Sequence, residues 1–295
     1  MAVAVVTDST AYLPPDLAAR HGIRVVPLHV VVAGTSYEES LDISAGEVAD
    51  ALRDFRPVST SRPTPASFEK LYRELTDAGV DEIVSIHLSA QMSATIESAE
   101  LAAGQVPVRV HVVDSRALGM TMGFAVLAAA EAAEAGAVGS DIVKLVRQSV
   151  DGGSAIFYVD TLEHLRRGGR IGKASALLGS ALSIKPLLTL TDGHIEPLER
   201  VRTATKALAR LEERTVAATA AMDAPDGVDV AVQHLDSLER AEQLVERLTD
   251  SIPTARRILL VELGAVVGAH VGPGTLAVSV NPRGAGRMPI VGAAT

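Results

Sequence analysis

Strand-like and helix-like segments alternate along the first half of the chain, and this alternation constrains the fold more than any other feature. Short runs rich in valine and isoleucine lie at 2–8, 24–32, 81–89 and 108–115. A segment with helical periodicity follows each run, and a further one precedes the run at 81–89; these segments lie at 13–22, 44–55, 65–79, from 93 onward and 117–138. Ser44 is placed to cap one helix, and Pro65 suits the first turn of the next. The pattern predicts a mostly parallel sheet with helices on both faces.

The second half of the chain has a different character. Two strand-like runs flank an expected turn at Asp192-Gly193, and two long polar-faced helices flank the run "VDVAVQHL". Gly152-Gly153 is a reasonable hinge between the halves. We therefore expect an α/β protein of two domains. An N-terminal α/β domain with the mostly parallel sheet covers 1–153, a smaller C-terminal α/β domain covers 154–282, and a loosely held tail covers 283–295.

Composition and charge exclude several classes of protein. The chain has 295 residues, of which 47% are apolar, so it can bury a large core. Its net charge of -9 argues against a surface for nucleic acid or anionic membrane. The weakly polar stretch 117–138 is interrupted by Glu131 and Glu134, which favours a buried helix over a membrane span. The absence of cysteine fits the cytoplasm, and we expect no stable membrane insertion.

Small hydroxyl and acidic residues gather at several strand ends. They form three clusters, which are Asp8, Ser9 and Thr10, then Ser89, Ser93 and Thr95, and finally Asp114 and Ser115. A fourth cluster, Ser59-Thr60-Ser61, is bracketed by Pro57, Pro63 and Pro65, which restrict its backbone. Ligands on α/β sheets gather where strands end and helices begin. Each residue alone is explained as a helix cap, but the clusters taken together are harder to attribute to capping alone.

Common catalytic and cofactor motifs do not fit the sequence. The segment "GGRIGKAS" fails as a phosphate loop, because Arg167 stands where the first glycine is required and Ala174 follows Lys173. No G-x-G-x-x-G follows the first strand, and the eight histidines form no zinc-ligand pattern, so we expect no cofactor and no metal. No G-x-S-x-G motif supports a serine hydrolase.

One histidine differs from the rest. His270 lies in the run "GAVVGAHVGPGTLAVSV", among small and aliphatic residues just before a Gly-Pro-Gly turn. A histidine in such surroundings is commonly a satisfied core residue. It can also donate a hydrogen bond to a carboxylate in a dry environment.

Six motifs occur along the chain in a fixed order. They are "VTDSTAYLP", "STSRPTP", "LSAQMSATIESA", "VVDSRALGMTMG", "LRRGGRIGKASALLGSALSIKPLL" and "GAVVGAHVGPGTLAV". Together they resemble the DegV family of bacterial fatty-acid-binding proteins. The resemblance extends from about Val3 to Val280. Arg62 stands where the family usually has glutamine.

The resemblance implies a function without catalysis. Family members bind one long-chain fatty acid between two domains and present its carboxylate to a separate ATP-dependent fatty acid kinase, whose acyl phosphate product enters phospholipid synthesis. By position in the motifs, Thr60, Ser61, Ser93, Thr95 and His270 would hold the head group. Arg170 would contact the kinase or the new phosphate, and Arg166, Arg167 and Lys173 are candidates for the same basic surface.

Composition agrees with an aliphatic ligand. Only 3% of residues are aromatic and none is tryptophan, so a large pocket must be lined by aliphatic side chains, which suit a flexible chain. Two alternatives stay open from the residues. One is a lipid or ester hydrolase that uses Ser93 or Ser61 with His270, and the other is a protein that binds a different apolar carboxylate.

Overall fold

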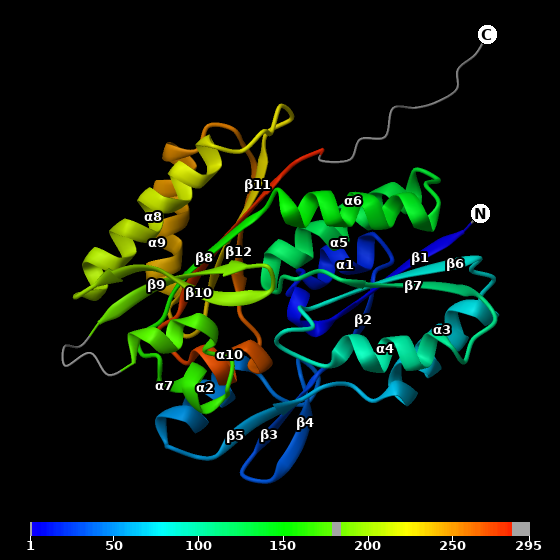
Figure 1. The fold of residues 1–295 in the computed structure, drawn as a ribbon, viewed down its shortest axis with the longest axis horizontal. Helices are drawn as coiled ribbons and strands as arrows, with labels where there is room; N and C mark the ends of the chain where they lie inside the picture. The colour runs from blue at the N-terminus through cyan, green and yellow to red at the C-terminus, as the bar shows by residue number, and fades with distance from the viewer. Residues whose placement is uncertain (1, 179–183, 285–295) are drawn as a thin grey trace.

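Three β-sheets organise the protein, and the computed structural model describes residues 2–178 and 184–284 (Figure 1). The first sheet is parallel, with strand order β2-β1-β6-β7. Its strands are β1 (Val3–Asp8), β2 (Arg24–Val26), β6 (Glu82–His87) and β7 (Arg109–Asp114). The predicted parallel sheet of the first half is therefore confirmed.

Helices cover both faces of this sheet. Helices α3 (Pro65–Asp77) and α4 (Thr95–Ala103) bury Phe68, Tyr72 and Ala99 against one face. The other face packs on α1 (Pro15–Arg20), α5 (Gly119–Glu134) and α6 (Gly139–Asp151). Figure 1 shows the two pairs α3/α4 and α5/α6 on opposite sides of the strands. Most of α5 is buried, as its low polarity predicts.

The segment 24–32, expected as one strand, is divided at Pro27. Its first part is β2, and its second part is β3 (His29–Val32), which leaves the parallel sheet. Proline has no N–H for a sheet hydrogen bond, which accounts for the break. Strand β3 lies between β4 (Thr35–Glu38) and β5 (Val58–Ser61) in an antiparallel sheet. The hydroxyl cluster at 59–61 thus belongs to a strand.

Helix α2 (Ala45–Arg53) begins at the residue the sequence predicts. Ser44 Oγ accepts a hydrogen bond from the Glu47 backbone N–H at 3.2 Å, and the Glu47 carboxylate accepts one from the Ser44 N–H at 2.9 Å. This reciprocal capping box satisfies two backbone donors that the first helical turn leaves unpaired.

The second half of the chain forms a six-stranded mixed sheet with the order β10-β9-β8-β13-β11-β12. Its strands are β8 (Ser154–Tyr158), β9 (Lys185–Thr191), β10 (His194–Val201), β11 (Val228–His234), β12 (Ala255–Glu262) and β13 (Leu276–Pro282). Strands β11 and β12 are parallel, and the other pairs are antiparallel. The expected turn at Asp192-Gly193 joins β9 to β10, and both residues have positive φ.

The two faces of the six-stranded sheet have different partners. Helices α8 (Ala204–Ala220) and α9 (Leu238–Ser251) pack on one face. The other face meets the first half of the chain and three short elements, α7 (Glu163–Arg167), η2 (Gly172–Leu177) and α10 (Ala265–Val271). Helix α10 also packs on α2 and, through Ala265 and Ala269, on the core of the first half.

Two sequence-based expectations concern the ends of these regions. The predicted domain boundary near residue 153 falls between α6 and β8 and stays a prediction. The expected tail, 283–295, lies outside the described residues except for 283 and 284. Within the described parts of the chain, no helix is both long enough and apolar enough to cross a membrane.

Candidate functional site

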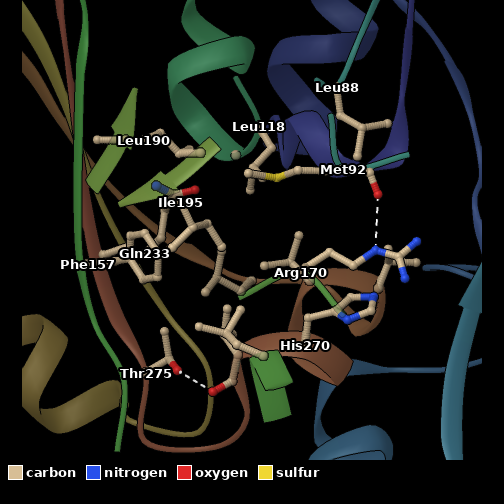
Figure 2. Close-up of a pocket in the computed structure, with 18 of the residues that line it drawn as sticks. Leu88, Met92, Leu118, Phe157, Arg170, Leu190, Ile195, Gln233, His270 and Thr275 are labelled. Carbon is tan, nitrogen blue, oxygen red and sulfur yellow. Dashed lines mark hydrogen bonds between the residues drawn. The ribbon is translucent and has the colours of Figure 1, made fainter. Parts of the chain in front are cut away.

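An apolar pocket lies between the six-stranded sheet and the first half of the chain (Figure 2). The space among its side chains measures about 830 Å³ when the open mouth is included. The lining residues come from both halves of the chain. They are Leu28, Leu88, Met92, Ser93, Leu118, Gly119, Ala155, Phe157, Leu165, Arg170, Leu190, Ile195, Gln233, Leu263, Val266, Val267, His270, Val271, Thr275, Ala277 and Ser279.

The floor of the pocket follows from the two-residue period of β-strands. Ala155 and Phe157 of β8 pair with Ser279 and Ala277 of β13, and all four line the pocket. The residues between them, such as Ile156, face the core that α8 and α9 cover. Two alanines in this floor leave room that larger aliphatic residues would fill.

Polar side chains in the floor form hydrogen bonds to other groups of the protein. Gln233 Oε1 accepts a hydrogen bond from the Met120 N–H at 2.9 Å, and Gln233 Nε2 donates to Ser279 Oγ at 3.0 Å. Thr275 Oγ1 donates to the backbone carbonyls of Val271 and Gly272, at 3.2 and 2.8 Å. Because these groups have partners, the floor presents an essentially apolar surface.

The mouth of the pocket contains a histidine with an unsatisfied nitrogen. His270 Nε2 lies 2.9 Å from Thr60 Oγ1, while its Nδ1 is buried and has no hydrogen-bond partner among the described residues. Burial, and secondarily the charge of Arg170, lowers the pKa of His270 to about 4. The imidazole is therefore neutral near pH 7. Gly168 packs so closely that a Cβ at this position would lie 2.1 Å from Nδ1, which explains the requirement for glycine there.

The other expected head-group residues lie nearby in different arrangements. Ser93 lines the pocket, and its Oγ lies 2.9 Å from the Oγ1 of the fully buried Thr95. Thr60 is half-buried on β5, whereas Ser61 is exposed. Since successive side chains of a strand point to opposite faces, Ser61 lies on the face away from His270. The structure thus brings Thr60 to His270 and Ser93 to Thr95, and it separates Ser61 from this group.

Arg170 borders the mouth, as Figure 2 shows. Its Nε donates to the Met92 carbonyl at 3.1 Å, and its Nη1 donates to the Gly168 carbonyl at 2.7 Å. These bonds hold the exposed guanidinium beside His270 and leave other N–H groups available.

The other basic side chains near Arg170, those of Arg166, Arg167 and Lys173, are paired with acidic side chains. Arg166 and Arg167 both bind Glu163, and they lower the pKa of that carboxyl group to about 2. Lys173 pairs with Glu196 at 2.5 Å. The basic surface expected around Arg170 is therefore partly neutralised, and Arg170 is the cation of this group that borders the pocket.

Ser85, His87 and Asp8 form a hydrogen-bonded chain, but this chain lies inside the protein. His87 Nδ1 is 3.0 Å from Asp8 Oδ2, and His87 Nε2 is 2.7 Å from Ser85 Oγ. All three side chains have 0% exposure, and Tyr72 donates to Ser85. Asp8 also accepts from the Leu88 N–H at 3.0 Å. The three hydrogen-bonded side chains connect β1 to β6, and a substrate cannot reach them because they are fully buried.

Other chemistry has little support in the described residues. No histidine in the described part of the chain is hydrogen-bonded to Ser93 or Ser61, so the hydrolase alternative lacks a nucleophile paired with a base there. Among residues 2–178 and 184–284, no group of three or more histidine, aspartate or glutamate side chains could hold a metal ion.

Sequence reasoning missed two functionally placed residues. Gln233 is a polar residue within the apolar run of β11, and this contrast was a signal that could have identified it. Glu39 is 1% exposed beside α10 and gave no local signal, because its partners lie far away in the sequence.

The fold and the pocket define a class of protein: an α/β protein with two main sheets and an apolar pocket whose open mouth carries polar groups. The family model described as "Uncharacterised protein, DegV family" matches residues 2–283. The chain therefore belongs to the DegV family, as its motifs predicted.

Relatives and solved structures agree with this assignment. A DegV domain-containing protein of Streptomyces coelicolor, SCO2569, is 53% identical, with 95% of this chain and 99% of the relative covered. A DegV family protein from Thermus thermophilus, described as binding fatty acid, has a TM-score of 0.88 at 35% identity, with 96% and 100% covered. DegV of Bacillus subtilis, described as a fatty acid binding protein, has a TM-score of 0.87 at 33% identity, with the same coverage.

Proposed function

We propose that this protein is a carrier without catalytic activity of its own, which buries one long-chain fatty acid in the pocket and exposes its carboxylate at the mouth. The observation that carries the proposal is the contrast between the apolar floor, whose polar atoms have protein partners, and the polar mouth at His270 and Ser93, where Thr60 contacts His270 from behind the lining. The fatty acid binding described for the Thermus thermophilus and Bacillus subtilis relatives supports it.

Hydroxyl protons would hold the carboxylate. With the proton of His270 on Nε2, the imidazole donates to Thr60 Oγ1, and the Thr60 O–H is then free for the ligand. In the second pair, one of Ser93 and Thr95 donates to the other, which again leaves one proton. We expect a smaller contribution from Ser61, because it lies on the other face of β5.

The energetics favour retention of a long acyl chain. Burial of about fifteen methylene groups at ~0.8 kcal/mol each gives on the order of 10 kcal/mol before the costs of ordering and association. The carboxylate adds little affinity of its own, but leaving it unpaired in the mouth would cost several kcal/mol. The hydroxyls therefore determine orientation, and the apolar floor provides most of the binding free energy.

The exposed carboxylate would be phosphorylated by a separate fatty acid kinase in the cytoplasm, and the acyl phosphate would be used for phospholipid synthesis. In this proposal Arg170 contacts the kinase or the new phosphate, because its guanidinium borders the mouth and is exposed. Arginine suits a phosphate contact through its planar set of N–H donors. No cofactor is needed in the carrier.

Native mass spectrometry of the purified protein tests the carrier function. We expect one fatty acid per chain, identified after extraction, or uptake of one when palmitate or oleate is offered to the delipidated protein. A chain that takes up neither, but retains an isoprenoid or retinoid acid, would show that another apolar carboxylate is the ligand. Turnover of acyl esters without a partner would instead support a hydrolase.

Acyl phosphate formation with a fatty acid kinase and ATP tests the role of Arg170. We expect Arg170→Ala to retain the lipid and to reduce acyl phosphate formation by about 10-fold or more, since a hydrogen bond to a charged group contributes about 1.5–3 kcal/mol. Arg247→Ala is the matched control, because Arg247 pairs with Glu212 on the surface that α8 and α9 form. Equal rates for the two variants would remove Arg170 from the proposal.

A further inference from the structure

A buried carboxylate lies directly behind the pocket wall. Glu39 follows β4 and is 1% exposed. Its Oε1 accepts a hydrogen bond from the Val266 N–H at 2.7 Å and from Tyr12 Oη at 3.2 Å, and its Oε2 accepts one from Ser9 Oγ. Burial raises the pKa of Glu39, and the three donors oppose this effect. A carboxyl group kept in such surroundings needs an explanation beyond core packing.

The hydrogen bonds of Glu39 extend to three residues that line the pocket. Val266 is bound directly. Ser9 Oγ accepts from the Leu28 N–H at 3.0 Å, and Tyr12 Oη accepts from the Val267 N–H at 3.1 Å. One side chain from the first half of the chain therefore anchors the backbone of two separate parts of the wall.

Helix α10 depends on this anchor for its first turn. It has seven residues, too few to be stable alone. Its N-cap, Gly264, makes no side-chain cap, so Glu39 and Tyr12 satisfy N–H groups that the turn leaves free. A Cβ at Gly264 would lie 2.4 Å from both Glu39 Oε1 and Tyr12 Cε1, so glycine permits the close approach.

The other end of α10 carries the polar group of the mouth. His270 lies one turn beyond Val266, and Thr60 contacts it from β5. The helix is thus held at its first turn by Glu39 and near its last turn by Thr60, both from the first half of the chain. A loss of the first contact leaves the helix free to tilt about the second, which would shift the wall residues Val267 and Val271.

We propose that Glu39 is a positioning residue for the lipid site: by capping α10 from a distance, it fixes the pocket wall and His270 and so slows release of the ligand. The inference rests on the proposed fatty acid binding. Glu39 does not touch the ligand in this account, because Ser9, Tyr12 and α10 lie around its carboxylate.

The test compares dissociation of a fluorescent fatty acid from four proteins: the wild type, Glu39→Ala, Glu39→Gln and Glu82→Ala. Glu82 is the matched control, because its Oε2 accepts from the Gly139 N–H at 2.8 Å at the start of α6, and it does not line the pocket. Both alanine variants remove a carboxylate that binds the first turn of a helix, so both lower the unfolding midpoint. Only Glu39→Ala is expected to release the ligand faster, by about 10-fold or more.

Glu39→Gln separates positioning from simple stability. Its amide oxygen can still accept from Val266, and its N–H can donate to Ser9, so we expect release within about threefold of the wild type. Tyr12→Phe, which removes one cap and keeps the ring, is expected to lie between the two Glu39 variants. Equal release from Glu39→Ala and Glu82→Ala would overturn the inference. A wild-type protein that binds no fatty acid would overturn the proposed function instead.

Discussion

The floor and the mouth of the pocket both contain polar side chains, but the two regions differ in whether those side chains have hydrogen-bond capacity left for a ligand. In the floor, Gln233 and Thr275 direct their polar atoms to protein partners. At the mouth, with the His270 proton on Nε2, the Thr60–His270 and Ser93–Thr95 pairs each leave one hydroxyl proton to donate. The polarity of a residue therefore does not decide what a pocket region binds. The hydrogen bonds that remain unused decide it.

Blocking the floor should have the largest effect. Ala277→Phe places a ring in the cavity beside Phe157 and would displace about five methylene groups of the ligand. At ~0.8 kcal/mol each, we expect affinity for a C18 acid to fall by about 1,000-fold, and affinity for a C10 acid to fall far less. Titration calorimetry with the two acids measures this. Ala209→Phe on the exposed side of α8 is the control, and an equal loss for both acids would contradict a chain-length effect.

Acidification should act on the mouth through His270. Between its folded pKa of about 4 and the ordinary value of 6.5, the unfolded chain binds a proton at this site that the folded chain does not. Stability therefore falls as the pH is lowered through this range, by up to about 3 kcal/mol. Urea unfolding of delipidated protein at several pH values measures the slope. His270→Asn should flatten it, while the slope due to His164 and His234, whose pKa values burial also lowers, should remain.

A matched pair of threonines compares the two regions directly. Thr60→Val removes a hydroxyl from the mouth and Thr275→Val removes one from the floor, with the same change of shape. We expect both variants to lower stability by about 1 kcal/mol or more, since each breaks a hydrogen bond within the protein. Thr60→Val should also weaken fatty acid binding by about 10-fold, whereas Thr275→Val should change affinity by less than about twofold. Affinity losses of the same size would show that the floor also contacts the head group.

The smallest effect is expected at Arg62. Its guanidinium binds the Glu97 carboxylate at 2.8 Å, and both side chains are largely exposed. Exposed ion pairs of this kind contribute about 0–1 kcal/mol. Arg62→Gln, which removes the charge and keeps a polar side chain, should therefore change the unfolding free energy by less than about 1 kcal/mol and leave lipid affinity unchanged. A clear gain or loss of affinity would place Arg62 at the mouth.

The sequence predicted the local features well. The alternation of runs specified the parallel sheet, Ser44 specified the start of α2, and the turn at Asp192-Gly193 was found where expected. These features depend on residues close together in the chain. The motifs also led to Ser93, Arg170 and His270, which line the pocket.

Contacts between distant residues could not be predicted in this way. Val266 lies 227 positions from Glu39, and His270 lies 210 positions from Thr60. Nothing in the local pattern at 24–32 indicates that the chain leaves one sheet for another after Pro27, although the proline marks the place. The face on which Ser61 lies likewise depends on the register of β5 with β3.

The buried line of Asp8, His87 and Ser85 has a consequence for the recognition of enzymes. Its three side chains meet the distance criteria by which a catalytic triad is identified on unrelated folds. What they lack is contact with solvent, since each is completely enclosed and Tyr72 covers the serine. A geometric template that ignores accessibility would therefore assign hydrolysis to this scaffold. Because of these three residues, the protein is a useful negative control for such templates.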